Sequence, residues 1–426
     1  MATSILRKRT VTIGTALALC LSLIGCSASS QKQTGQSSSD GIPSSSIKLG
    51  LSPYGDELLI AAAIKRGYLK DVGITVSNGT YGAKTDLIKS VTPLLNKQID
   101  LGSGYPPSVA SQLDNVKDVV GFAYSDVFFG YRILAPKGKY KTLSEEMKKG
   151  KGFDEALTTV MKQLKGKEVL LRTGVAPTFY NLLGKYSNSS MDDWEVTYLS
   201  NDDILRQAEA GNAKFVSPTG AVEISRLQKE GWESLVDLQQ AIQYMPKNET
   251  VALRATFSGY ITTRSYAEKN WDTLLRFTSV MYRIIKDMQS NPQGTADDFV
   301  AYVNSYTGSS LTAKELASTF DGLYELQNFD DADAMFNDSS SDFNFRKVMD
   351  ANLKVLQEQK VLKGSYTSDD LSDANKIYND LKKYKTKTDA LLKGKSASDK
   401  TVIKAKKYYD MYDFLDAYRI AKTLEQ

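Results

Sequence analysis

A short apolar strand, a glycine-containing turn and a helical segment follow one another three times near the start of this chain. Strands are expected at residues 47–51, 74–76 and 99–102, and helices at residues 56–66, 83–96 and from about residue 107 to 115. Parallel strands need a crossover between them, which is usually a helix. The order therefore predicts an α/β fold with a mostly parallel sheet.

The same order of elements starts again downstream. Strands are expected at residues 168–171, 195–199 and 214–216, followed by helices at residues 176–185, 202–210 and 221–229. An apolar crossing segment, VFFGYRILA at residues 127–135, and a charged insert at residues 137–167 separate the two series, and a return segment follows at residues 251–263. Two series joined by two crossings predict two lobes with a hinge and a ligand cleft between them.

The end of the chain is expected to add a helical extension to these lobes. Charged helices are expected over residues 367–394 and 398–425, and the second carries one stripe made of Tyr408, Tyr412, Leu415 and Arg419. We expect this stripe to pack on the first lobe or on its partner helix. The alternatives are a docking surface for another protein, and contact of the Lys-rich surroundings with an anionic membrane.

An export signal is expected at the N-terminus. Arg7, Lys8 and Arg9 precede an apolar stretch, residues 11–25, that is too short to span a bilayer comfortably. The sequence Leu-Ile-Gly-Cys that ends at Cys26 resembles the lipobox of bacterial lipoproteins, in which the signal is cut before the cysteine and the cysteine sulfur carries a diacylglycerol. The Ser/Gly/Gln-rich residues that follow favour a solvated tether. The alternative is an uncleaved anchor helix with an incidental cysteine.

The predicted organisation therefore has six parts. They are a signal peptide (residues 1–25), a tether (26–45), lobe 1 (46–131), lobe 2 (132–260), a return to lobe 1 with the helical C-terminal part of the binding fold (261–364), and a helical extension (365–426).

Composition after signal removal disfavours several classes of function. The chain has 54 basic and 50 acidic residues, and loss of residues 1–25 leaves a formal charge of only +1, so we expect no nucleic-acid partner. Cys20 leaves with the signal, Cys26 is the expected lipid site, and the chain has no histidine. The acidic run at residues 328–342 lacks the third ligand and the glycine of an EF-hand loop. We therefore expect no catalytic residue, metal or cofactor. We also expect the chain to be a monomer.

Several motifs together resemble a known family. IKLGLSPYGDELLIAAAIKRGYLKDVGITV, QIDLGSGYPPSVA, KGKEVLLRTGVAPTFYNLLGKY and GNAKFVSPTGAVEISRLQKEG are similar in order and spacing to a periplasmic-binding-protein-like II domain. The resemblance covers residues 46–364. Within that fold, the motifs resemble those of the substrate-binding lipoproteins of ABC importers for nitrate, taurine, alkanesulfonates and thiamine pyrimidine precursors. It implies a receptor that passes a small solute to a membrane permease.

Candidate ligand-binding residues lie where the predicted strands end and helices begin, because such junctions converge on one crevice. The set comprises Tyr54, Asp56, Tyr81, Ser103, Tyr105, Arg172, Thr173, Thr178 and Thr219. The junctions at residues 102–105 and 172–178 are the best anion candidates, because the helical turn that follows each has no acidic residue. Their hydroxyls, from Ser103, Thr173 and Thr178, are equally compatible with routine helix capping.

The charged and aromatic candidates have alternatives of their own. The guanidinium of Arg172 either pairs with a sulfonate, carboxylate or phosphate of a ligand or forms a salt bridge at the surface of the protein. The carboxylate of Asp56 either offsets the dipole of the helix that it begins or, if it faces the cleft, favours a ligand with an amine or ring N–H donor. Tyr54, Tyr81 and Tyr105 each flank a glycine or proline in a turn, which suits a ring that stacks on a ligand, although the chain has 24 tyrosines.

These features favour a lipid-anchored, extracytoplasmic solute-binding protein of an ABC importer on the cell membrane. Its expected ligand is a small polar or anionic organic solute, such as a sulfonate, a nitrate-like ion or a pyrimidine. The alternatives are a pyrimidine-synthase-like enzyme on the same fold, which would favour a histidine-bearing active site, and a lipoprotein adhesion or assembly factor that uses the C-terminal helices.

Overall fold

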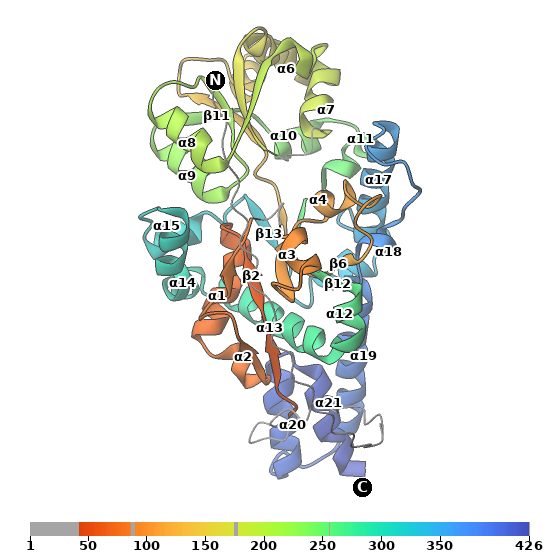
Figure 1. Ribbon diagram of the computed structural model, residues 1–426. Coiled ribbons are helices and arrows are strands. Elements are labelled where there is room, and N and C mark those ends of the chain that lie inside the picture. The colour runs from red at the N-terminus through yellow and green to blue at the C-terminus, as the bar shows by residue number, and fades with distance from the viewer. Residues whose placement is uncertain (1–41, 87–89, 174–177, 255, 426) are drawn as a thin grey trace, which may run out of the picture. The chain divides into compact units, whose positions relative to one another are not determined.

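The computed structural model describes residues 42–425 except 87–89, 174–177 and 255. Cys26 and the expected signal and lipobox lie outside the described residues. The chain forms two main β-sheets with helices around them (Figure 1), which confirms the predicted α/β class. Among the residues that the structure describes, none of the helices combines the length and apolarity needed to cross a membrane.

The first sheet has six strands in the order β13-β6-β12-β5-β2-β4. Their bounds are β2 Leu49–Leu51, β4 Ala83–Lys84, β5 Leu101–Gly104, β6 Val119–Phe128, β12 Phe257–Thr263 and β13 Tyr324–Leu326. Strand β2 pairs in parallel with β4 and β5, whereas β12 runs antiparallel to β5 and β6. Strands β1 (Ser45–Ile47) and β3 (Ile74–Val76) form a separate parallel pair.

The second sheet has five strands in the order β11-β7-β10-β8-β9. Their bounds are β7 Arg132–Pro136, β8 Glu168–Arg172, β9 Glu195–Leu199, β10 Phe215–Ser217 and β11 Trp232–Asp237. The three predicted strands, β8 to β10, are parallel as expected. Strand β7 runs antiparallel to β10 and β11.

Helices surround both sheets. In the first half of the chain they are α1 Gly55–Lys65, α2 Tyr68–Asp71, α3 Val91–Leu95, α4 Pro106–Ala110, α5 Leu143–Lys148, α6 Phe153–Met161, α7 Thr178–Ser187 and α8 Asn201–Glu209. In the middle they are α9 Ala221–Lys229, α10 Leu238–Tyr244, α11 Lys247–Thr250, α12 Arg264–Lys269, α13 Trp271–Ser290, α14 Pro292–Thr307 and α15 Ala313–Ser318. The remainder are α16 Ala332–Phe336, α17 Phe345–Glu358, α18 Ser368–Leu371, α19 Ala374–Leu392, α20 Lys400–Asp410 and α21 Phe414–Lys422.

Aromatic side chains form the core between the first sheet and α13. The ring of Phe277 on α13 lies 4.9 Å from that of Tyr260 and 5.7 Å from that of Phe122, measured between centroids. All three are fully buried, and burial of each such side chain stabilises the fold by about 1.5–3 kcal/mol. The apolar spacing of residues 266–290 predicts a helix with one buried face, but the structure divides this segment into α12 and α13, and α13 is buried on all sides from Thr273 to Tyr282.

The predicted helix at residues 83–96 is wrong. Ala83 and Lys84 form β4, beside β2, and the helix α3 begins only at Val91. Pro93 has no N–H and is tolerated only in the first turn of a helix, so a helix continuous through it is disfavoured. The predicted helix at residues 398–425 is also interrupted, because Tyr412 has a left-handed φ of 64° and Asp413 caps α21 by accepting a hydrogen bond from the Asp416 N–H.

The chain crosses between the two sheets twice. The first crossing is residues 129–131, between β6 and β7, and the second runs through α10, α11 and a short 3-10 turn to β12. The return strand starts at Phe257, so residues 257–260 pair in the first sheet, although the predicted lobe 2 extended to residue 260.

The C-terminal helices pack on one another and on α13 (blue in Figure 1). Arg276 of α13 forms a buried bidentate ion pair with Asp416 of α21, with Nε–Oδ2 and Nη2–Oδ1 distances of 2.6 and 2.9 Å. Tyr408 and Leu415 of the predicted stripe are buried, and Arg419 is exposed and pairs with Asp272. The expected packing of this stripe inside the chain is therefore confirmed for its apolar members.

Candidate ligand-binding site between the two sheets

Arg172 connects the two sheets at the end of β8. Its Nη2 lies 3.3 Å from Oδ2 of Asp86 and 3.5 Å from the hydroxyl of Tyr54, both in the first lobe. Its Nη1 donates to the carbonyl oxygen of Thr173 at 2.6 Å, and its Nε has no hydrogen-bond partner. The arginine is buried, so this contact is shielded from solvent.

Tyr54 lies in the turn between β2 and α1. Its backbone is extended, and the helix begins at the next residue. Burial raises the pKa of its hydroxyl to about 12, although Arg172 opposes the shift. The hydroxyl therefore stays protonated at neutral pH and is able to donate a hydrogen bond.

Tyr105 contacts the first crossing between the lobes. Its hydroxyl lies 2.9 Å from the hydroxyl of Tyr131, the last residue before β7. The Tyr131 ring in turn packs against Phe179 of α7, with centroids 6.3 Å apart. Tyr105 therefore lies beside the hinge segment, where a change in lobe orientation would alter its contacts.

The second sheet contributes polar residues at the end of β10. The Ser217 hydroxyl donates to the Arg132 carbonyl at 2.5 Å and lies 2.7 Å from the Tyr180 hydroxyl. The Thr219 backbone N–H donates to Oδ1 of Asn201, which holds the turn before α9. The Thr219 side chain is half-buried.

Glu223 follows in the first turn of α9 and is buried. Burial and the charge of Asp202 together raise its pKa to about 7, against the opposing effects of a backbone hydrogen bond, Arg226 and Arg172. Its charge also acts on the pKa values of Tyr54 and Tyr324 in the first lobe. The start of α9 therefore faces the first sheet.

Three carboxylates lie together on the first-lobe side; we call Asp56, Glu57 and Asp126 the acidic cluster. Asp56 and Glu57 are in the first turn of α1, and Asp126 is on β6. Burial raises the pKa of all three, and the charge of Asp56 raises the values for Glu57 and Asp126 further. Ser125 donates to Oδ2 of Asp126 at 2.6 Å.

Many polar atoms around the acidic cluster have no hydrogen-bond partner within the described residues. They are Oδ1 of Asp56, both carboxylate oxygens of Glu57, Oδ1 of Asp126 and the hydroxyls of Ser52 and Tyr324. Buried polar groups are nearly always hydrogen-bonded in native proteins. The same groups act on one another's pKa values, since Tyr324 and Asp126 bond Asp56 and Ser52 bonds Glu57, so the cluster's nearest partners are its own members.

The remaining predicted residues lie elsewhere or have other contacts. Ser103 is fully buried, and its hydroxyl accepts a hydrogen bond from the Ser52 N–H at 3.0 Å. Tyr81 packs on Tyr302 of α14, with centroids 4.4 Å apart. Thr173 is exposed, and Thr178 is half-buried at the start of α7. The structure thus brings Tyr54, Asp56 and Arg172 into one region and places Tyr81 on a helix surface of the first lobe.

Sequence reasoning missed Asp126, Glu223 and Tyr324. A signal existed for Asp126, because it is a charged residue within a strand that is otherwise almost wholly apolar. Glu223 resembled an ordinary acidic residue at a helix start. The sequence around Tyr324 contains no motif that indicates a site. Tyr324 lies near Asp126 only because β13 pairs with β6, and the two residues are almost 200 positions apart in the sequence.

Comparison with solved structures shows which fold this is. The nitrate-binding protein NrtA from Synechocystis PCC 6803 aligns with a TM-score of 0.54 and 10% identity, over 79% of this chain and 88% of that one. The alkanesulfonate-binding protein SsuA from Xanthomonas axonopodis pv. citri, bound to MOPS, aligns with a TM-score of 0.53 and 15% identity, over 78% and 98%. The fold is that of a periplasmic binding protein.

A third structure agrees with this assignment. The aliphatic sulphonate-binding protein SsuA from Escherichia coli has a TM-score of 0.52 and 16% identity, over 76% of this chain and 91% of that one. The predicted fold, two lobes of the periplasmic-binding-protein type with additional C-terminal helices, is therefore confirmed. No family model and no curated protein matches the sequence.

Proposed function

We propose that this chain is an extracytoplasmic solute-binding protein of an ABC importer. It captures a small polar solute between its two lobes and delivers it to a membrane permease. The observation that carries the proposal is the buried Arg172 at the end of β8, whose guanidinium contacts Tyr54 and Asp86 of the other lobe and keeps an Nε without a hydrogen-bond partner in the described residues. Ligand contacts to both lobes would favour the closed conformation, and no bond chemistry is required.

The fold supports this proposal by analogy. The structural neighbours are named as nitrate- and alkanesulfonate-binding proteins, and this chain has a similar fold. A fold hosts many functions, so the argument rests on the site in this chain. Arg172, Tyr54 and Tyr105 are the residues we place nearest the solute.

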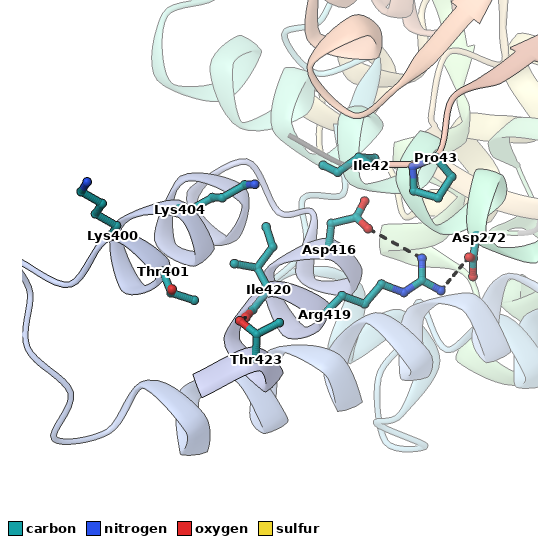
Figure 2. A pocket seen from close by; sticks show the side chains of 10 residues that line it. All are labelled: Ile42, Pro43, Asp272, Lys400, Thr401, Lys404, Asp416, Arg419, Ile420 and Thr423. Carbon is teal, nitrogen blue, oxygen red and sulfur yellow. Dashed lines mark hydrogen bonds and ion pairs between the residues drawn. The ribbon is translucent and has the colours of Figure 1, made fainter. Parts of the chain in front are cut away.

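A lipid anchor at Cys26 completes the proposal. The lipobox and the export signal support attachment to the outer face of the cytoplasmic membrane. The described chain starts at Ile42, which lines a pocket of about 690 Å³ between α20, α21 and α13 (Figure 2). The described chain therefore begins beside the C-terminal helices.

A solute screen tests the function. The full chain, purified from membranes in detergent, is screened by thermal shift and native mass spectrometry against nitrate, sulfonates, carboxylates, pyrimidines and amines. A binding solute should raise the melting temperature in a concentration-dependent way and add its mass in a 1:1 ratio. Arg172→Ala and Tyr105→Ala should reduce the shift. The proposal fails if no class raises the melting temperature.

A further inference from the structure

Positive charge is concentrated in the C-terminal helices. Residues 374–426 contain 13 basic and 7 acidic residues, whereas residues 26–373 contain 38 basic and 43 acidic residues. The C-terminal part therefore has a formal charge of +6, and the preceding part has a formal charge of −5. An asymmetry of this size between two parts of one chain favours an anionic partner for the basic part.

Four exposed lysines follow one another around the turn between α19 and α20; we call them the lysine patch. It consists of Lys393, Lys395, Lys400 and Lys407. Within the described residues, the first three of these side chains form no ion pair. The positive charge of this turn is therefore available to a partner outside the chain.

Helix stability accounts for only part of the lysine patch. Lys393 and Lys395 follow the last turn of α19, and Lys407 is in the last turn of α20, where a cation offsets the helix dipole. Lys400 begins α20, where a cation is disfavoured, and Asp399 already caps that helix. The fold therefore gains nothing evident from the charge of Lys400.

Helix α20 combines this charge with an exposed apolar side chain. Lys400, Ile403 and Lys407 are three and four positions apart, so they share one face of the helix, and all three are exposed. Ile403 is 54% exposed, which is more than any other large apolar side chain in the described part of the chain. An apolar side chain among lysines is typical of a helix that contacts the membrane interface.

The described chain begins beside the lysine patch. Ile42 and Lys400 line the same pocket of about 690 Å³, and Figure 2 shows Lys400 on α20. The 16 residue steps from Cys26 to Ile42 span at most about 60 Å when fully extended. A lipid on Cys26 would therefore keep the lysine patch within reach of the membrane surface.

We propose, building on the lipid anchor proposed above, that the lysine patch docks on anionic phospholipid headgroups of the membrane that holds the anchor. Clusters of lysines are attracted to anionic lipids over roughly one Debye length, about 10 Å at 0.1 M salt. Interfaces between proteins are depleted in lysine, so a lipid surface fits this face better than a second protein does. Docking fixes which end of the receptor faces the bilayer.

Energy transfer to the bilayer tests the docking. The full chain, purified from membranes, is reconstituted in vesicles of phosphatidylcholine alone or with 30% phosphatidylglycerol, each with a headgroup-labelled acceptor lipid. A donor dye is attached at Ala397→Cys, in the turn before α20, or at the exposed reference position Tyr198→Cys on β9. Lipidated Cys26 offers no thiol to the dye.

Transfer from Ala397→Cys should rise by about twofold or more when phosphatidylglycerol is present, because the lysine patch then approaches the headgroups. The rise should disappear in 0.5 M NaCl, which screens exposed charges. Transfer from Tyr198→Cys should change less, since no lysine of the patch is on β9.

Charge variants locate the contact. The test variant replaces three lysines of the patch by glutamine, and the matched control replaces three exposed lysines between α6 and β8 in the second lobe. They are Lys393→Gln, Lys395→Gln and Lys400→Gln in the test variant, and Lys162→Gln, Lys165→Gln and Lys167→Gln in the control. The test variant should lose the response to phosphatidylglycerol and the control should keep it. Both should keep the melting temperature of the unmodified chain, because all six side chains are exposed.

Each contrary result has its own meaning. Equal transfer from Ala397→Cys on both kinds of vesicle, with the chain still bound to both, overturns the docking and leaves the anchor and the solute-binding function standing. A response that survives the test variant, or that the control also loses, overturns the placement on the lysine patch.

Vesicle flotation separates the docking from the anchor. A chain that leaves phosphatidylcholine vesicles and floats with those that contain phosphatidylglycerol supports the docking and contradicts the anchor. A chain that floats with neither overturns both, and the solute screen then decides the binding function separately.

Discussion

The Nη2 atom of Arg172 lies 3.5 Å from the Tyr54 hydroxyl, which links the end of β8 in the second sheet to the turn after β2 in the first. The same atom lies 3.3 Å from Asp86, so one buried guanidinium contacts two residues of the opposite lobe. Arg172 therefore reports on how closely the lobes approach.

Arg172→Gln should lower the free energy of unfolding by about 1–3 kcal/mol, because a buried charged hydrogen-bond donor is lost. Urea unfolding followed by circular dichroism measures the change. Arg206→Gln is the matched control, because Arg206 is exposed and pairs with Asp203 within the same helix. It should change the free energy of unfolding by less than about 0.5 kcal/mol. Equal effects of the two substitutions would contradict the inter-lobe role.

Glu223 should make the fold less stable as pH rises. Its pKa is about 7 in the folded chain and close to 4.5 when unfolded, so the folded state holds an extra proton between these values. The stability is complete below pH 4.5 and is lost as pH rises through 7. Glu223→Gln should therefore stabilise the chain at pH 8, on the order of 2–3 kcal/mol, and leave it unchanged at pH 4.

The test compares urea unfolding of wild-type and variant chains at the two pH values. The charged groups that act on the pKa of Glu223 are Asp202, Arg226 and Arg172. The Glu268→Gln control, at an exposed glutamate of α12, should give no difference at either pH. A Glu223→Gln effect of the same size at pH 4 and pH 8 would show that the carboxyl does not titrate as described.

The Arg276–Asp416 pair should hold the C-terminal helices on α13. Asp416→Asn leaves the buried guanidinium without its full charge partner and should cost roughly 3–5 kcal/mol. Asp272→Asn is the matched control, because Asp272 of α13 forms an exposed pair with Arg419, which lies on α21 like Asp416. This substitution should lower the free energy of unfolding by about 0–1 kcal/mol. Thermal unfolding followed by circular dichroism compares them, and similar losses would refute a special role for the buried pair.

Cys26→Ser should abolish lipidation and leave the chain shed or retained as precursor, because the acyl chains attach through this sulfur. Cys20→Ser is the matched control, since this residue lies inside the expected signal and should be dispensable for attachment. Membrane fractionation and intact-mass spectrometry give the result. Membrane retention of a cleaved Cys26→Ser chain would disprove the anchor.

Local patterns predicted much of the fold. The strand at residues 195–199 and the helix at residues 221–229 occur at those bounds, because each is a periodic run bounded by turn residues. The segment at residues 83–96 failed because pairing with β2, a non-local contact, outweighed its helical composition. Strand β11 was not predicted, since its position at the edge of the second sheet depends on β7.

The site was predictable only in part. The strand–helix junctions that contain Tyr54 and Arg172 meet, with the Arg172 Nη2 atom 3.5 Å from the Tyr54 hydroxyl, because the ends of parallel strands converge. The hydroxyl of Ser103 was expected to be available to an anion, but it accepts the backbone N–H of Ser52. The acidic character of the site depends on Asp126, which antiparallel pairing between β6 and β12 brings to this edge. No local pattern carries that contact.

The distance between the two lobes tests the central claim most directly. Spin labels at Leu95→Cys on α3 and Tyr198→Cys on β9, both at exposed positions, report this distance when Cys20 and Cys26 are replaced by serine. Pulsed electron paramagnetic resonance is recorded with and without the solute that raises the melting temperature. The account predicts a distance distribution that becomes narrower and shifts when the solute is added. An unchanged distribution in the presence of a bound solute would contradict capture between the lobes.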